Sequence, residues 1–107
     1  MTAALREPTV FILSTLARGP LHGYGVIKAV EELSGGRLRL RAGTLYDALD
    51  RLARDGFVVF EGEESVGGPP RRNFAITAAG RRLLAAEAAR MEETASVVRA
   101  QLARRMT

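Results

Sequence analysis

The chain has 107 residues, of which 47% are apolar, and a formal net charge of +4. This length supports one compact core and is too short for two independent ones. Cysteine is absent, which excludes disulfides and thiolate metal sites and is compatible with a cytoplasmic location. The first residues lack the pattern of a signal peptide, and no apolar run approaches the roughly 20 residues of a membrane span. We therefore expect a soluble cytoplasmic protein that does not contact a membrane.

The basic residues are all arginine except Lys28. A positive balance fits a partner rich in phosphate, because each cation that neutralises a phosphate releases condensed counterions. The choice of arginine over lysine carries little information, since a chain rich in arginine and alanine is typical of a GC-rich genome. The placement of the charges is more informative than their number.

Two short helices are predicted in the first third of the chain. Residues 9–17 are apolar on nearly all sides, which predicts a buried helix that starts near Pro8 and stops at Gly19. Residues 21–25 lead into a second helix that ends at a pair of glycines. Its apolar face comprises Val26, Ile27, Val30 and Leu33. We expect it to be the first helix of a helix-turn-helix pair.

Residues 37–41 alternate arginine with leucine. This period of two predicts a short strand or an extended connector with Leu38 and Leu40 facing inward. Three arginines then point to solvent directly before the next helix.

Residues 42–55 carry the most informative pattern in the chain. At about 100° per residue, one side is apolar and is formed by Leu45, Ala48, Leu49, Leu52 and Ala53. The other side carries Asp47, Asp50, Arg51 and Arg54, with Gly43 and Thr44 at its N-terminal edge. The helix ends on Gly56 and passes at once into the apolar stretch 57–60, as a recognition helix joins the wing of a winged helix-turn-helix domain. DNA is therefore the leading candidate for a partner.

The stretch 57–60 pairs with residues 71–76 in a predicted β-hairpin. Residues 61–70 between them are acidic and rich in glycine, which predicts a loop of about ten residues that is mobile or functional. Thr77 is a suitable N-cap for a last helix.

The last helix is predicted over residues 78–106 and has a heptad seam. The seam consists of Leu84, Ala88, Met91, Ala95, Val98 and Leu102. A helix of about 28 residues is about 40 Å long, which exceeds the diameter of so small a domain, so part of it protrudes. We expect a second copy to cover the seam in a two-fold dimer. The alternative is a helix that folds back on its own domain.

Residues for catalysis or metal binding are scarce. His22 is the only histidine, which leaves almost nothing for a metal cluster or a Ser-His-Asp triad. Its expected role is local, in the turn before the second helix. No pair of carboxylates is set for acid–base chemistry, and neither glycine-rich stretch has the lysine and Ser/Thr of a P-loop. We expect no enzyme, no metal and no cofactor.

Three blocks of residues match a known family in order and spacing. They are LHGYGVI at 21–27, GTLYDALDRL at 43–52 and GPPRRNFAITAAGR at 68–81. The chain thereby resembles the PadR-type transcriptional regulators of the short class, with a single C-terminal dimerisation helix. The resemblance implies a mainly α fold with a small β-hairpin wing (α+β). It also implies a winged helix-turn-helix DNA-binding domain at residues 1–77 and a dimerisation helix at residues 78–107.

Such regulators are homodimers that bind an inverted-repeat operator in double-stranded DNA and usually repress the adjacent gene. The recognition helix enters the major groove, and wing arginines approach phosphates or the minor groove. The implied DNA contacts are Gly43, Thr44, Tyr46, Arg51, Arg54, Arg71 and Arg72. Some relatives bind a small effector, so an apolar or aromatic molecule in the groove between the domain and the long helices is a second hypothesis. Certain multidrug-binding relatives use a tryptophan there, which this chain lacks.

Physical arguments support these contacts to different degrees. The N–H groups of Gly43 and Thr44 lie at a helix N-terminus, where phosphate is favoured. Tyr46 flanks the apolar face, so a DNA contact and a half-buried place in the core carry equal weight. Arg71 and Arg72 follow two prolines and form either a wing contact or a solvated pair that neutralises glutamates across the hairpin.

Two departures from the family pattern bear on the strength of binding. Many members have proline and a basic residue where this chain has Asp47 and Asp50, whose carboxylates repel phosphate. These carboxylates could instead accept a hydrogen bond from cytosine N4, or pair with the arginines one turn later. The second wing strand often carries tyrosines where Asn73 and Phe74 stand. We expect modest affinity and strong salt dependence, and the alternative function is a protein-interaction or ligand-sensing module with weak or no specific DNA binding.

Overall fold

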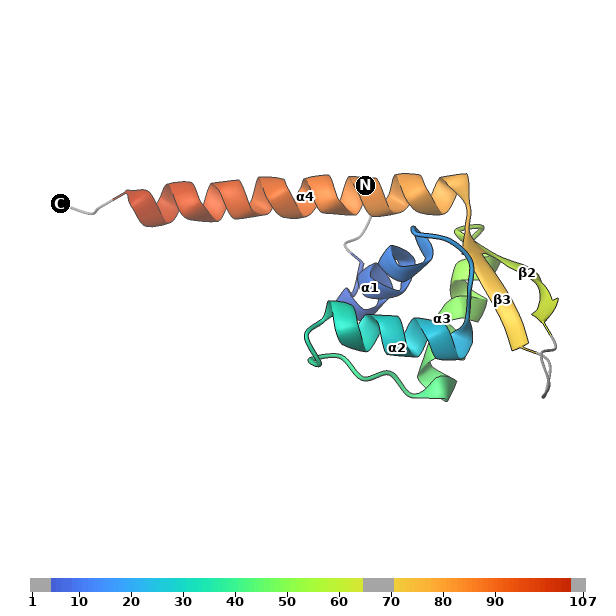
Figure 1. Ribbon diagram of the computed structural model, residues 1–107. Helices are drawn as coiled ribbons and strands as arrows, with labels where there is room; N and C mark the ends of the chain where they lie inside the picture. Colours follow the sequence, from blue (N-terminus) through green and yellow to red (C-terminus); the bar gives the residue numbers. More distant parts are fainter. Residues whose placement is uncertain (1–4, 65–70, 105–107) are drawn as a thin grey trace.

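The computed structural model describes residues 5–64 and 71–104, with the backbone alone at residues 63, 64 and 71. Its elements in chain order are α1 (Glu7–Leu16), β1 (Leu21–His22), α2 (Gly23–Leu33), α3 (Ala42–Arg54), β2 (Val58–Glu64), β3 (Arg71–Ile76) and α4 (Ala78–Ala103). The first three helices form a body with the sheet at one side, and α4 lies across α1 and extends far beyond it (Figure 1). The molecule is therefore elongated, with extents of 68 × 29 × 21 Å.

The core forms where the apolar faces of the first three helices meet the sheet. Its buried members are Ile12, Leu13, Leu16, Val26, Val30, Leu45, Ala48, Leu49, Leu52, Val58 and Phe74. Four of the five residues predicted for the inner face of α3 are among them. Ala53 is exposed, which contradicts the prediction, because it lies at the edge of the apolar stripe, where no element covers it.

Single residues determine where α2 begins and α3 ends. His22 caps α2, because its Nδ1 atom accepts a hydrogen bond from the Gly25 N–H at 3.0 Å. This confirms the local role expected for His22. Gly56 ends α3 with a φ of +82°, and the Phe57 N–H then reaches the Leu52 carbonyl oxygen at 2.9 Å. The chain passes from α3 directly into the wing, as predicted.

The segment between α2 and α3 is an extended connector, one of the two forms predicted for it. Leu38 and Leu40 are half-buried and pack against the core. Arg37, Arg39 and Arg41 are exposed. The inward and outward alternation of this segment is therefore confirmed.

The sheet is antiparallel, in the order β1-β3-β2. The predicted two-stranded hairpin is thus incomplete, because β1 adds a third strand in which Leu21 pairs with Phe74 and His22 with Asn73. A strand of two residues is too short to show an alternating pattern. Its partner is also distant in the sequence.

The wing strand β2 is longer than predicted. It runs to Glu64, so the predicted loop of about ten residues is wrong and the connection comprises residues 65–70, which lie outside the described residues. Pairing in β2 shifts between Phe60 and Gly62, so that Glu61 is an extra residue in a β-bulge. Bulges increase strand twist, which changes the direction in which the wing projects.

The N-terminus of α4 packs on the turn between α3 and β2. Thr77 is the predicted N-cap, and its Oγ1 accepts a hydrogen bond from the Gly80 N–H at 3.0 Å and donates one to the Gly56 carbonyl oxygen at 2.7 Å. A Cβ at Gly80 would lie 2.2 Å from the Phe57 carbonyl oxygen, so only glycine permits this approach. The helix ends at Ala103 rather than near residue 106.

Candidate nucleic-acid interface

The N-terminus of α3 is open to solvent. Gly43 and Thr44 are exposed, and no heavy atom lies within 4 Å of the place that a Cβ of residue 43 would take. The N-cap residue is Arg41, whose side chain makes no capping hydrogen bond. The first N–H groups of a helix have no partner within it. Here they are accessible donors at the positive end of the helix dipole, an arrangement that favours an anion.

The outer face of α3 carries charges of both signs. Arg51 and Arg54 are exposed in its last turns. Asp47 and Asp50 are exposed on the same helix. Among the residues with a described position, neither aspartate forms an ion pair with the arginine one turn later, so the structure does not contain those pairs. Both carboxylates are exposed, and no basic side chain of the described residues forms an ion pair with them.

Tyr46 is half-buried where α3, α2 and β3 meet. Its ring centroid lies 6.1 Å from that of Phe74, with an interplanar angle of 56°. Its hydroxyl packs so closely on α2 that a Cβ at Gly23 would lie 2.3 Å from the hydroxyl oxygen. The geometry favours the interpretation of Tyr46 as an anchor for α3. A DNA contact by this residue stays a prediction.

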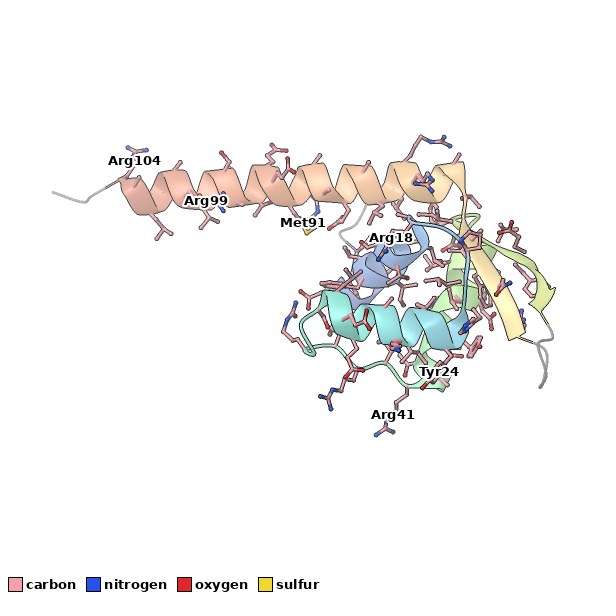
Figure 2. The ribbon with its side chains drawn as sticks, viewed as in Figure 1. Arg18, Tyr24, Arg41, Met91, Arg99 and Arg104 are labelled. Carbon is pink, nitrogen blue, oxygen red and sulfur yellow. The ribbon has the colours of Figure 1, made fainter. Side chains whose placement is uncertain are left out.

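Two of the three exposed connector arginines are engaged within the protein. Arg37 pairs with Glu7, and Arg39 Nε lies 3.2 Å from Glu31 Oε1. Arg41 has no ion pair within the described part of the chain. Figure 2 shows it pointing away from the body on the side opposite α4. Arg41 therefore joins the candidate contacts, although the sequence pattern gives no reason to separate it from the other two.

Tyr24 is a second exposed residue that the sequence does not single out. It lies in the first turn of α2, is 70% exposed, and is on the same side of the body as Arg41 (Figure 2). Scattered apolar residues are normal on surfaces, but a large aromatic ring this exposed is notable.

The wing presents Arg72 against two aromatic rings. Its guanidinium carbon Cζ lies 4.9 Å from the ring centroid of Phe60 and 5.3 Å from that of Phe74. The two phenylalanines are direct cross-strand partners with ring centroids 6.1 Å apart. Arg72 is exposed. The backbone of Arg71 belongs to β3, but its side chain lies outside the described residues.

The predicted seam of α4 changes character along the helix. Leu84 packs against the core of its own chain, and Ala95 is half-buried. Ala88 is exposed, and Met91, Val98 and Leu102 are 43%, 50% and 79% exposed. The body therefore covers only the start of the seam, and the alternative of a helix folded back along its whole length is not what the structure has.

A buried carboxylate that was not predicted connects α4 to the N-terminal segment. Glu87 is 6% exposed, and it accepts hydrogen bonds from Arg90 Nε at 3.2 Å and from the Leu5 N–H at 3.4 Å. The hydrogen bond from Arg90 lowers the pKa of Glu87, while desolvation opposes this shift. A charged residue in a helix normally predicts a solvated face. The spacing of three residues to Arg90 is the one sequence signal for this contact.

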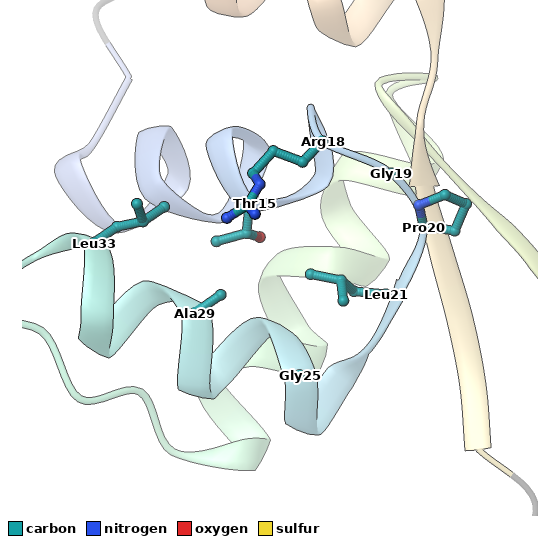
Figure 3. A pocket seen from close by; sticks show the side chains of 8 residues that line it. All are labelled: Thr15, Arg18, Gly19, Pro20, Leu21, Gly25, Ala29 and Leu33. Atoms are coloured by element: carbon teal, nitrogen blue, oxygen red, sulfur yellow. The ribbon is translucent and has the colours of Figure 1, made fainter.

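Among the cavities that border α1 in the described part of the chain, two lie between this helix and a helix other than α3. One, of about 290 Å³, lies between α1, β1 and α2, with Arg18 and Leu33 among its walls (Figure 3). The other, also about 290 Å³, lies between α1 and α4 and is lined by Phe11 and Met91 among others. The second cavity lies in the groove that the sequence predicts for an effector. Both volumes are near the lower end of the range for small-molecule pockets.

Metal sites and membrane spans are the remaining classes of site to consider. Over residues 5–64 and 71–104, no group of three His, Cys, Asp or Glu side chains is placed to hold a metal ion. No helix in this part is long and apolar enough to cross a membrane.

A three-helix body whose exposed α3 leads into a projecting β-hairpin defines the class of winged helix-turn-helix proteins. The model of the family described as "Transcriptional regulator PadR-like family" matches residues 12–86. The chain belongs to this family of transcriptional regulators, which confirms the resemblance noted in the sequence. The predicted α+β fold with a long C-terminal helix is also confirmed.

Among three relatives of the chain, two are named as transcriptional regulators. The chain is 38% identical over 87 residues to "Transcriptional regulator Rv3488" of Mycobacterium tuberculosis, covering 81% of this chain and 78% of that protein. It is 43% identical over 82 residues to an uncharacterized 37.1 kDa protein in transposon TN4556 of Streptomyces fradiae. It is 35% identical over 74 residues to "Transcriptional regulator YqjI" of Escherichia coli. The last two matches cover 77% and 69% of this chain but only 22% and 34% of those longer proteins.

Solved structures share the fold. A PadR-like transcription factor from Bacteroides fragilis is 31% identical, with a TM-score of 0.73 and coverage of 85% of both chains. The structure of Bacillus subtilis PadR in complex with operator DNA is 21% identical, with a TM-score of 0.65. That match covers 95% of this chain and 50% of the Bacillus chain. At this identity the second likeness concerns the fold alone.

Proposed function

We propose that this chain is a homodimeric DNA-binding transcriptional repressor that binds an inverted-repeat operator. The observation that carries the proposal is the open N-terminus of α3, where Gly43 and Thr44 are exposed next to Arg41, which has no ion pair among the described residues. The wing supplies a further exposed cation, Arg72. The Bacillus subtilis relative is described as a complex with operator DNA, which supports the same class of partner here.

In the proposed complex, α3 enters the major groove, which admits an α-helix. Its first N–H groups and Arg41 meet backbone phosphates, which fixes the register of the protein on the duplex. Arg51 and Arg54 lie along the groove. Arg71 and Arg72 contact the backbone or the minor groove beyond it. Since each neutralised phosphate releases counterions, affinity falls as salt rises.

The dimer is proposed from the second half of α4. A helix of 26 residues is about 39 Å long, and its C-terminal half protrudes from the body (Figure 1). Val98 and Leu102 in this half are largely exposed apolar side chains. A two-fold contact between two such helices removes them from water and presents two α3 helices to the two arms of an inverted repeat. Occupation of an operator that overlaps a promoter then blocks transcription.

Fluorescence anisotropy with labelled duplexes tests the proposal. The probes are the inverted repeat found in the promoter next to the gene and a scrambled duplex of the same composition. We expect tighter binding to the repeat and a log–log salt slope of several units. Size-exclusion chromatography with light scattering is expected to give twice the chain mass. Equal binding to both duplexes would contradict an operator-specific repressor, and a monomer would contradict the α4 dimer.

A second candidate function is a winged-helix module that recognises protein or senses a ligand, with weak or no specific DNA binding. The observation in its favour is that Asp47 and Asp50 stand exposed and unpaired, in the described structure, on the helix that would face DNA. The cavity between α1 and α4 could hold a small apolar or aromatic effector. A dimer that ignores every duplex at low salt would favour this function. Thermal shift against a set of aromatic compounds tests ligand sensing, which is compatible with DNA binding.

A further inference from the structure

A row of aromatic rings runs from the recognition helix into the wing. Tyr46 of α3 and Phe60 of β2 each lie 6.1 Å, between ring centroids, from Phe74 of β3. Phe74 is 1% exposed, so its place in the core accounts for it. Phe60 is 42% exposed, and core packing does not account for an aromatic ring at that position. Its close neighbour at the exposed end of the row is Arg72.

The sheet geometry places Arg72 on the side of the wing that faces α3. Residues two apart in a strand project from the same face, so Arg72 shares a face with Phe74. Phe74 contacts Tyr46 of α3 on that face. The register that sets Phe60 opposite Phe74 brings a second ring to the guanidinium, whose Cζ lies 4.9 Å from the Phe60 centroid. Arg72 therefore lies on the face of the wing that is turned toward the recognition helix.

The stack occupies the flat faces of the Arg72 guanidinium and not its N–H groups. A guanidinium packs its flat faces on aromatic rings and keeps its N–H donors at the edge, where they match the oxygens of a phosphate. Among the residues whose positions are described, none accepts a hydrogen bond or an ion pair from Arg72. Within the described part of the chain, the guanidinium is therefore held by its faces, and its N–H donors have no partner.

We propose that Phe60 is a positioning residue for DNA binding, whose ring holds the Arg72 guanidinium so that its N–H donors meet a backbone phosphate. This inference rests on the proposed function. A long arginine side chain loses rotamer freedom when it binds, and a stack formed in the free protein lowers that cost. The cation–π contact at an exposed site corresponds to about a two- to fivefold change in an equilibrium constant.

A double-mutant cycle tests whether Phe60 acts through Arg72. The probe is a duplex that the wild-type protein selects from a random-sequence pool, and binding is measured by anisotropy across a salt series. We expect Phe60→Leu to weaken binding about two- to fivefold with the salt slope kept, because the charge remains. Arg72→Ala is expected to weaken binding about tenfold and to lower the slope by about one for each wing in contact. In the Arg72→Ala background, Phe60→Leu is expected to have no further effect.

Control variants separate positioning from folding. Phe60→Tyr keeps the ring and is expected to bind as the wild type does. Val59→Ala removes another exposed apolar side chain of β2, 47% exposed, and is also expected to leave binding unchanged. NMR relaxation of the Arg72 Nε–Hε group gives a test that does not depend on DNA. We expect this group to be more mobile in Phe60→Leu than in the wild type. Thermal melts check that each variant folds.

The outcomes distinguish this inference from the proposed function. A wild-type protein that selects no duplex overturns the proposed function and this role together. A wild-type protein that binds its duplex while Phe60→Leu binds equally tightly overturns the role of Phe60 alone. The role of Phe60 is also overturned if the losses from Phe60→Leu and Arg72→Ala are additive. It is overturned as well if the Arg72 Nε–Hε group is equally mobile in the wild type and in Phe60→Leu.

Discussion

Replacing Gly43 by alanine separates the stability of α3 from its proposed contact with DNA. An added Cβ would meet no heavy atom within 4 Å, and Gly43 does not have a positive φ. Glycine within a helix costs about 0.5–1 kcal/mol relative to alanine. Because Gly43 lies in the first turn, we expect Gly43→Ala to stabilise the protein by about 0.5 kcal/mol. This corresponds to a rise of about 2–4 °C in the melting temperature.

The same methyl group is expected to weaken DNA binding. It would stand on the surface beside the first-turn N–H groups, which in the proposed complex lie against a phosphate. A charge-assisted hydrogen bond that is lost or lengthened costs about 1.5–3 kcal/mol, or about tenfold or more in affinity. The two effects have opposite signs, so weaker binding could not be attributed to unfolding.

Thermal melts followed by circular dichroism give the stability, and anisotropy with the selected duplex at fixed salt gives the affinity. Thr44→Ser is a matched control, because it changes an exposed side chain of the same turn without adding bulk to the backbone. A Gly43→Ala protein that is more stable and binds as tightly as the wild type would refute the close approach of this turn to DNA. A Gly43→Ala protein that is less stable than the wild type would contradict the finding that a Cβ at residue 43 meets no heavy atom within 4 Å.

Three further changes test other parts of the structure. Gly80→Ala is expected to destabilise the protein by about 1–3 kcal/mol in urea denaturation, opposite in sign to Gly43→Ala, because its Cβ would lie 2.2 Å from a backbone oxygen. Glu87 has a lowered pKa in the folded state, so its contribution to stability is present at neutral pH and is lost as the pH falls below about 4 and through that pKa. The stability difference between the wild type and Glu87→Gln is therefore expected to shrink in acid, and a difference independent of pH would contradict this. The double substitution Asp47→Asn, Asp50→Asn is expected to raise affinity for scrambled duplexes at low salt, and reduced affinity for the selected duplex alone would instead indicate contacts with cytosine.

Helix α3 could be predicted from sequence because its pattern is local. Leu45, Leu49 and Leu52 recur with the helical period, and a buried face against the core is the ordinary consequence of that period. The end at Gly56 follows from a residue that tolerates a positive φ. The prediction that Ala53 is buried is wrong because alanine is compatible with either side of a helix, and burial at the edge of an apolar stripe depends on which element packs there.

The features that the sequence does not show depend on contacts between distant residues. Strand β1 exists because Leu21 and His22 pair with Phe74 and Asn73 of β3. A stretch of two residues is too short to show the alternating pattern of a strand. The stack of Arg72 on Phe60 depends on the register across the hairpin, which a bulge at Glu61 shifts by one residue. Glu87 is buried only because the N-terminal segment at Leu5 covers it. None of these follows from spacing along one element.

The contacts of α4 place constraints on any operator that the proposed dimer could bind. Its first turns are fixed to the body through the close approach of Gly80 to Phe57 and, farther along, through the hydrogen bond between Glu87 and Leu5. The apolar seam beyond Glu87 is mostly exposed and is the part available to a second copy. The two-fold axis of the dimer would then be set by the second half of α4, and the position of α3 relative to that axis by the first. Because the close approach of Gly80 to the Phe57 carbonyl oxygen holds the start of α4 against the body, the spacing between the two arms of the operator would depend on this junction as well as on α3 itself.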